Sequence, residues 1–205
     1  MIYDLESLDG HAKSSLLLSI VLPRPIALVT SLNNDATVDI APFSLFNLVS
    51  LAPPIVYISI QKTDPPKRTG INIEKMREFV INIPHYKIAE GMNKAASSPR
   101  FYGKDKFEFC ELTNVTSNKI NTCGIKEALI RLECKFYNKI DFGGYEMFMG
   151  EILYIYCDES IIEDDQVSID KHEFISRLGP KELYSKIESS SIFMMKRYEG
   201  NIYEG

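Results

Sequence analysis

This sequence of 205 residues contains no pair of cysteines with the spacing of metal ligands. Its four cysteines, Cys110, Cys123, Cys134 and Cys157, form no Cys-x-x-Cys pair, and the three histidines lie away from them in the chain. This spacing does not indicate a zinc site, and a chain of this length does not call for a disulfide framework. We therefore expect reduced, partly buried thiols in a cytoplasmic protein that has no metal site.

Long apolar runs are also missing. The run Leu16–Leu22 resembles the core of a signal peptide. The region before it carries Asp4, Glu6 and Asp9, however, whereas a secretory signal begins with basic residues. The run is also much shorter than the roughly 20 apolar residues that a membrane span needs. We expect a chain that is neither secreted nor inserted in a membrane.

The chain also has no excess of positive charge. Lysine and arginine number 23 against 28 aspartates and glutamates, so the formal net charge is −5. Binding to a nucleic-acid backbone needs a basic face, and this balance argues against nucleic acid as the main partner. The motifs GxGxxG and GxxxxGK[ST] do not occur either. Any nucleotide must therefore be held by means other than a Rossmann turn or a P-loop.

The composition is that of a globular protein with a core, at 45% hydrophobic and 25% charged residues. The length fits a single domain over residues 1–205. Residues 1–22 are predicted to form a lead-in with a short helix. Residues 185–205 are predicted to form a tail, and its apolar segment Ile192–Tyr198 is expected to dock on another surface.

The first half of the chain predicts strands and short helices. Two β-rich runs, Ile26–Leu32 and Thr37–Phe43, flank the polar connector Asn33–Ala36, which predicts a hairpin with a four-residue loop. A polar run over 44–50 follows, and then a third strand over Ile55–Ile60. Helices are expected over 70–77, capped by Thr69, and over 85–96, with a strand over Phe79–Ile83 between them.

The second half predicts a long hairpin. Ala128–Asp141 alternates apolar and polar residues, and Tyr145–Tyr156 is apolar on both faces, which favours a central strand or an interface. Residues 101–124 have no clean period, Glu159–Asp170 reads as an exposed acidic connection, and Lys181–Tyr184 after Pro180 reads as a short helix. Together these elements predict a mainly β, α+β fold, an antiparallel barrel with short flanking helices.

Hydroxyls, amides and a basic cluster punctuate the apolar strands, which suits a barrel wall with an anionic ligand at its rim. Each group also has a structural interpretation. Thr30 and Ser31 can simply end a strand, and Phe43 is by default a core aromatic. Lys67 and Arg68 can be a solvated loop pair. Arg24, held extended between two prolines, can be a surface arginine in a rigid turn.

The order of several motifs resembles the flavin reductase-like, FMN-binding split-barrel family. These are PRPIALVTS, APFSLFN, a Pro-Pro before a strand, K-x-T leading to EFVINIP, and later ALIRLEC, MGEI and RLG-x-x-x-Y. The resemblance covers about Leu22 to Tyr184. It implies a Greek-key split barrel, a homodimer and FMN near the subunit interface. It also implies reduction of flavin by NADH or NADPH, or electron transfer as in flavoredoxin.

The resemblance further implies which residues contact FMN. Around the phosphate and ribityl chain it puts Thr30, Ser31, Ser59, Lys67 and Thr69. Arg68, an extra cation between the last two, is a further candidate for the phosphate or for the 2′-phosphate of NADPH. Around the isoalloxazine the resemblance puts Ala41, Pro42, Phe43, Ser44 and Asn47, and Arg24 is a further candidate at the strand entrance. Hydride transfer between nicotinamide and flavin requires no side-chain acid or base, so no catalytic residue is named.

The sequence departs from the family pattern at three places. Arg68 stands where the family often has aspartate, and Ala52 stands where many members have aspartate before the Pro-Pro. The turn Gly144–Glu146 lacks a histidine that flavin reductases often have there, so direct use of NAD(P)H has less support than FMN binding.

The expected function is an FMN-dependent NAD(P)H oxidoreductase that passes electrons to free flavin, an iron complex or a partner such as a monooxygenase. The alternatives are a flavoredoxin-like carrier that does not use NAD(P)H directly, or a non-redox FMN-binding protein.

Overall fold

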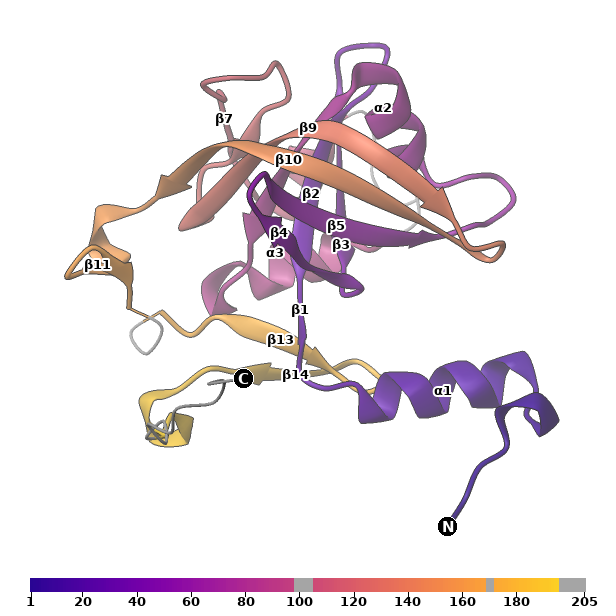
Figure 1. The fold of residues 1–205 in the computed structure, drawn as a ribbon. Helices are drawn as coiled ribbons and strands as arrows, with labels where there is room; N and C mark the ends of the chain where they lie inside the picture. Colours follow the sequence, from indigo (N-terminus) through magenta and orange to yellow (C-terminus); the bar gives the residue numbers. More distant parts are fainter. Residues whose placement is uncertain (98–104, 169–171, 196–205) are drawn as a thin grey trace, which may run out of the picture.

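A computed structural model describes residues 1–97, 105–168 and 172–195 (Figure 1). Seven antiparallel strands form one curled sheet in the order β3-β2-β6-β9-β10-β5-β4. Their bounds are β2 Ala27–Leu32, β3 Val38–Phe43, β4 Phe46–Leu51, β5 Pro54–Gln61, β6 Glu78–Ile83, β9 Ile130–Asp141 and β10 Tyr145–Cys157. The expected antiparallel, mainly β barrel with short flanking helices is confirmed.

Smaller elements surround this sheet. The helices are α1 Gly10–Ile20, α2 Arg68–Met76, α3 Ala89–Ala95 and α4 Lys106–Cys110, with 3-10 turns at Leu5–Ser7, Tyr86–Ile88, Glu159–Ile161 and Ser189–Ser191. The short strands are β1 Arg24–Pro25, β7 Asn114–Val115, β8 Gly124–Ile125, β11 Ile162–Glu163, β12 Gln166–Val167, β13 Ile175–Leu178 and β14 Leu183–Lys186. In Figure 1, α1 and the β13–β14 pair lie together below the barrel.

Both predicted hairpins are confirmed, although the first has five residues, Asn33–Thr37, between its strands where four were expected. β2 and β3 pair along their full length, and the connector closes through a hydrogen bond of 2.8 Å from the Asn33 amide to the Thr37 carbonyl. β9 and β10 pair from Asp141 to Ile130, with two register shifts, across a turn in which Gly143 adopts a φ of 80°. β10 lies between β9 and β5, so it is the central strand that its apolar faces predict.

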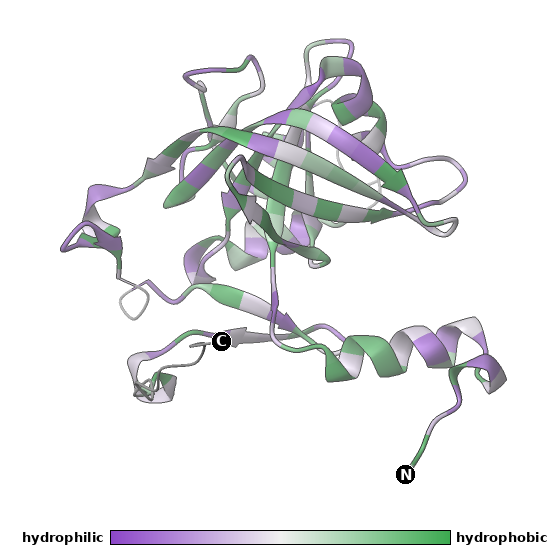
Figure 2. Ribbon diagram, in the orientation of Figure 1, coloured by the Kyte–Doolittle hydropathy of each residue, from purple (hydrophilic) through white to green (hydrophobic). Residues whose placement is uncertain are grey.

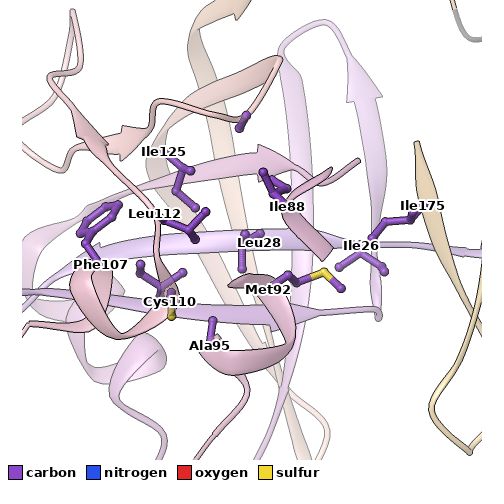
Figure 3. Packing of buried hydrophobic residues seen from close by; sticks show 12 residues of the cluster. Ile26, Leu28, Ile88, Met92, Ala95, Phe107, Cys110, Leu112, Ile125 and Ile175 are labelled. Atoms are coloured by element: carbon purple, nitrogen blue, oxygen red, sulfur yellow. The ribbon is translucent and has the colours of Figure 1, made fainter. Parts of the chain in front are cut away.

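The core has two parts because β2 is buried on both faces. Ala27 and Val29 point into the barrel interior, where they meet Ile58, Phe79 and Phe148 among others. Alternate residues of the same segment point the opposite way, as two-residue periodicity requires. There Ile26 and Leu28 pack under α3 and α4 with the residues that Figure 3 draws as sticks.

Several local predictions are wrong, each for a tertiary reason. The run over 44–50 contains the strand β4, which pairs with β5. The predicted helix over 181–184 gives way to β14, which pairs with β13. Thr69 does not cap α2; the N-cap residue is Lys67, which makes no side-chain capping bond. The helix predicted over 85–96 is a 3-10 turn followed by the shorter α3.

The two ends of the chain agree partly with expectation. The predicted helix of the lead-in is α1, and none of its residues is buried. The tail begins within β14, which pairs with β13, but the described part of its apolar segment does not dock within the chain, because Phe193, Met194 and Met195 are 79%, 98% and 79% exposed. The rest of the predicted docking segment, residues 196–198, lies outside the described residues. No helix within the described ranges is long and apolar enough to cross a membrane.

Candidate functional site

A pocket of about 570 Å³ lies beside β3, between the start of α2 and the end of α3. We call it the β3 pocket. Its lining residues are Asp39, Ala41, Pro42, Phe43, Pro65, Pro66, Lys67, Arg68, Thr69, Ala95, Ala96, Ser97 and Lys106. The volume is in the range of small-molecule and cofactor sites.

The start of α2 makes one end of the β3 pocket positive. Lys67 and Arg68 are exposed there, and the N-cap residue leaves the first turn of the helix without a side-chain cap. The first N–H groups of a helix have no partner within it and carry the positive end of the helix dipole. The Lys67 ammonium also lies 6.0 Å from the centre of the Phe43 ring. This end of the pocket therefore suits an anion.

A buried polar cluster forms another part of the wall. Asp39 is 5% exposed and accepts two hydrogen bonds, from the Thr69 hydroxyl at 3.0 Å and from the Lys106 ammonium at 2.9 Å. Both side chains of the Asp39–Lys106 ion pair are 6% exposed. The cluster joins β3, α2 and α4 at the pocket, because each of its three residues comes from a different element.

The β3 pocket brings together part of the predicted site. Its lining includes the β3 segment Ala41–Phe43 and the α2 segment Lys67–Thr69. These residues are 24 or more positions apart in the sequence and meet because α2 packs against β2 and β3. The two predicted segments therefore face the same space.

Three other predicted residues have partners in the wall and do not line the β3 pocket. The Thr30 hydroxyl donates to the Cys123 carbonyl at 2.7 Å, and the Ser31 hydroxyl accepts from Asn72 at 3.1 Å. Both side chains are fully buried. Arg24 is 4% exposed, and its guanidinium donates to carbonyls at the end of α1 and at Gly179. Burial, and then the nearby Arg177, lowers the Arg24 pKa. The structure gives these side chains a role in holding elements together.

The remaining predicted residues lie on the β4–β5 side of the barrel. Ser44, Asn47 and Ser59 do not line the β3 pocket. Asn47 is exposed, and its side-chain oxygen accepts from the Leu48 amide at 2.8 Å. Ser59 pairs with Met147 across β5 and β10. The structure therefore does not place these residues in the wall of the β3 pocket.

Sequence reasoning missed Asp39, Lys106 and the end of α3. A signal for Asp39 exists, since it is the only charged residue in the strand VDIAPF and shares a strand face with Ala41 and Phe43. Lys106 has no comparable signal, because it lies in the segment without a clean period, 67 positions from Asp39. Only the packing of α4 against β3 brings the two together.

The thiols close to this region are poor nucleophiles. Burial raises the pKa of Cys110 to about 11, although the charge of Lys106 acts in the opposite direction. Burial also raises the pKa of Cys123. Since the thiolate is the reactive form, neither is an activated cysteine at neutral pH. Within the described part of the chain, no three His, Cys, Asp or Glu side chains gather as a metal site.

Comparison with known proteins gives a consistent picture. The model of the flavin reductase like domain matches residues 19–172. An uncharacterized protein of Aquifex aeolicus (strain VF5) is 34% identical over 177 residues, covering 84% of this chain and 89% of the relative. Nitrilotriacetate monooxygenase component B from Bacillus cereus superimposes with a TM-score of 0.88 at 26% identity, over 95% of this chain and 98% of that one. The Pseudomonas fluorescens 2-nitrobenzoate 2-nitroreductase NbaA superimposes with a TM-score of 0.86 at 30% identity, over 100% of both chains.

Proposed function

The chain belongs to the flavin reductase-like domain family, and from that premise we propose that it binds FMN in the β3 pocket and acts as an NAD(P)H-dependent oxidoreductase. One observation carries the proposal. The pocket joins a positive, uncapped helix start to a wall of small residues, prolines and the aromatic Phe43. This combination suits a ligand that is a phosphate at one end and a flat ring system at the other.

The phosphate would lie at the start of α2. Lys67 and Arg68 supply positive charge, and the backbone N–H groups of the first turn supply donors. A helix of nine residues is long enough for its dipole to favour an anion at this end. Charge-assisted hydrogen bonds of this kind are among the stronger ones in proteins.

The ring system would lie along Ala41–Phe43 of β3. Alanine leaves the backbone accessible, and Pro42 and the largely buried Phe43 add apolar surface to the wall. FMN supplies the hydride chemistry when it is bound, so the chain needs to bind and orient it and to shape its electrostatic surroundings. No lining residue is required as an acid or a base.

The proposal predicts a flavoprotein that is bleached by a nicotinamide nucleotide. The protein would be mixed with FMN, filtered to remove free flavin, and examined anaerobically by absorbance before and after adding NADPH or NADH. We expect a retained flavin band that disappears within seconds, because hydride transfer to bound flavin removes its visible absorbance. A protein that retains no flavin would overturn FMN binding itself.

A flavoredoxin-like carrier is the second candidate. The observation that favours it is the turn from Phe142 to Tyr145, which contains two glycines and no histidine. In the same experiment a carrier keeps its flavin band after NADPH or NADH is added and loses it only with a reductase partner. A band that persists would therefore replace the first proposal with the second. A non-redox FMN-binding protein would keep its flavin band after a nicotinamide nucleotide is added and also after a reductase partner is added.

The proposed acceptors are free flavin, an iron complex or a partner protein. One structural neighbour is a component of a monooxygenase and another is a nitroreductase by name. These names support a redox partner such as a monooxygenase as one class of acceptor. All four cysteines are free, as expected in a reducing compartment, and we propose the cytoplasm as the location.

We propose a homodimer from the apolar residues that the single chain leaves exposed. Leu48, Val49 and Leu51 of the edge strand β4 are 48%, 53% and 79% exposed. The half of α1 next to β1 is also apolar, as Figure 2 shows, yet no α1 residue is buried. Exposed patches of this kind mark interaction surfaces.

Changing Leu51→Glu is expected to weaken this dimer at least about tenfold, because a buried carboxylate costs more than 1.4 kcal/mol, the equivalent of tenfold in affinity. Sedimentation equilibrium would measure the dissociation constant of both forms. Ile71→Glu is the matched control, since Ile71 is 46% exposed but lies on α2, which contacts β2, β3 and β6. A wild-type chain that stays at 23.3 kDa at all concentrations would contradict the dimer.

A further inference from the structure

The Asp39–Lys106 ion pair has no evident reason to be in a wall of the β3 pocket if stability alone is considered. Both side chains are 6% exposed. Buried ion pairs lose hydration on folding, and well-packed apolar residues often replace them without loss of stability. This pair nevertheless lines the pocket beside the cationic start of α2. The position of the ion pair in the pocket wall suggests a role in ligand binding.

The hydrogen bonds of Asp39 also change what Thr69 can offer. The Thr69 hydroxyl donates to the Asp39 carboxylate at 3.0 Å. A hydroxyl carries one proton, so this group cannot donate to a phosphate at the same time. What Thr69 can still donate is its backbone N–H, in the first turn of α2. Another residue must therefore supply the side-chain hydrogen bond to the phosphate that the family resemblance predicts for Thr69.

We propose that Lys106 is a phosphate-recognition residue and that Asp39 is the positioning residue that holds Lys106 and Thr69 against the pocket. The proposal rests on FMN binding in the β3 pocket. Lys106 brings a positive charge to the same pocket from α4, on a buried and ion-paired side chain, whereas Lys67 and Arg68 are exposed. The cluster then makes the pocket select FMN over riboflavin, which has the same ring and ribityl chain without the phosphate.

Asp39 has a cost in this arrangement, because its carboxylate lies on the same wall as the phosphate. The two substitutions Lys106→Met and Asp39→Asn should therefore act in opposite directions. Removing Lys106 takes away positive charge and leaves the buried Asp39 carboxylate without its cation, with the Thr69 hydroxyl still donating to it. Replacing Asp39 with asparagine removes the negative charge, while its carbonyl oxygen can still accept a hydrogen bond from Lys106.

The test measures dissociation constants of FMN and riboflavin by flavin fluorescence, and compares the preference for FMN between variants. We expect a preference about tenfold higher in Asp39→Asn and about 100-fold lower in Lys106→Met. The double variant should fall about tenfold below wild type, because each charge-assisted hydrogen bond is worth one to two powers of ten. Riboflavin affinity should change little in all three.

Controls separate this inference from folding and from the proposed function. Lys94→Met removes another ion-paired lysine, bound to Glu111 and outside the β3 pocket, and should leave the preference unchanged. If Lys106→Met does not fold, the double variant and Asp39→Asn still decide, since neither leaves a buried carboxylate without its cation. A double variant within about twofold of wild type would overturn the role of Lys106. A wild-type protein that binds neither flavin would overturn FMN binding, and this inference with it.

Discussion

Replacing Gly150 with alanine is expected to lower the free energy of unfolding by about 3 kcal/mol, the upper end of the usual cost of overpacking a core. A Cβ atom built on Gly150 would lie 2.5 Å from Cζ and 2.8 Å from Cε1 of Phe79, and 3.0 Å from Cβ of Cys134. Both neighbours are fully buried in the barrel interior. Neither Phe79 nor Cys134 can move away without disturbing the packing around it, since protein interiors are close-packed.

Gly150 also lies at a register shift between β10 and β9, next to Met149. At this point β10 passes so close to Phe79 that only a residue without a side chain fits. The glycine of the motif MGEI therefore has a physical reason in this chain. It allows the central strand to approach the aromatic core of the barrel.

Urea unfolding followed by circular dichroism would measure this effect. Gly144→Ala is the matched control, because a Cβ there meets no atom within 4 Å, and its cost should stay within about 0.5 kcal/mol. The double variant Phe79→Leu, Gly150→Ala should have a free energy of unfolding at least about 1 kcal/mol higher than the sum of the two single changes predicts. The reason is that Phe79→Leu removes the ring atoms that the new Cβ at position 150 would clash with. Simple additivity of the two changes would contradict the proposed clash.

The sequence predicted those strands whose apolar pattern matches their burial. The β2–β3 and β9–β10 hairpins are of this kind, with turn residues between two regular runs. β4 was missed because most of its residues are exposed and its serine and asparagine resemble a loop. β14 was missed because Pro180 and the residues after it favour a helix start, whereas pairing with β13 decides the outcome. Tertiary pairing overrides local preference in both cases.

The candidate site was predicted where its residues are contiguous and face one way. Lys67–Thr69 at the start of α2 and the end of β3, where Ala41 and Phe43 share a strand face, meet this condition and line the β3 pocket. Thr30 and Ser31 do not line it, because both side chains are fully buried and hydrogen-bonded to Cys123 and Asn72 inside the wall. Lys106 could not be predicted at all, since its place depends on how α4 packs against β3. Long-range packing is what the sequence pattern does not contain.

Reversing both charges at the start of α2, with Lys67→Glu and Arg68→Glu, is expected to weaken FMN binding by about 1000-fold. Each charge-assisted hydrogen bond contributes about 1.5–3 kcal/mol, and the new carboxylates also repel the phosphate. Riboflavin binding should change by less than about threefold, since it has no charge to repel. Flavin fluorescence titrations with both ligands, at low and at high salt, would measure this. The wild-type affinity for FMN should fall with salt because the cations are exposed.

This double reversal is informative because it should not harm the fold. Carboxylates at the N-terminus of a helix interact favourably with its dipole, so the variant is expected to keep its melting temperature. The matched control is Lys62→Glu with Lys75→Glu, which changes the net charge equally at two lysines outside the β3 pocket. If FMN and riboflavin weakened together, the flavin ring and not the phosphate would lie at α2. If neither weakened, the β3 pocket would not be the flavin site, and the buried Asp39–Lys106 pair would have to be explained by folding alone.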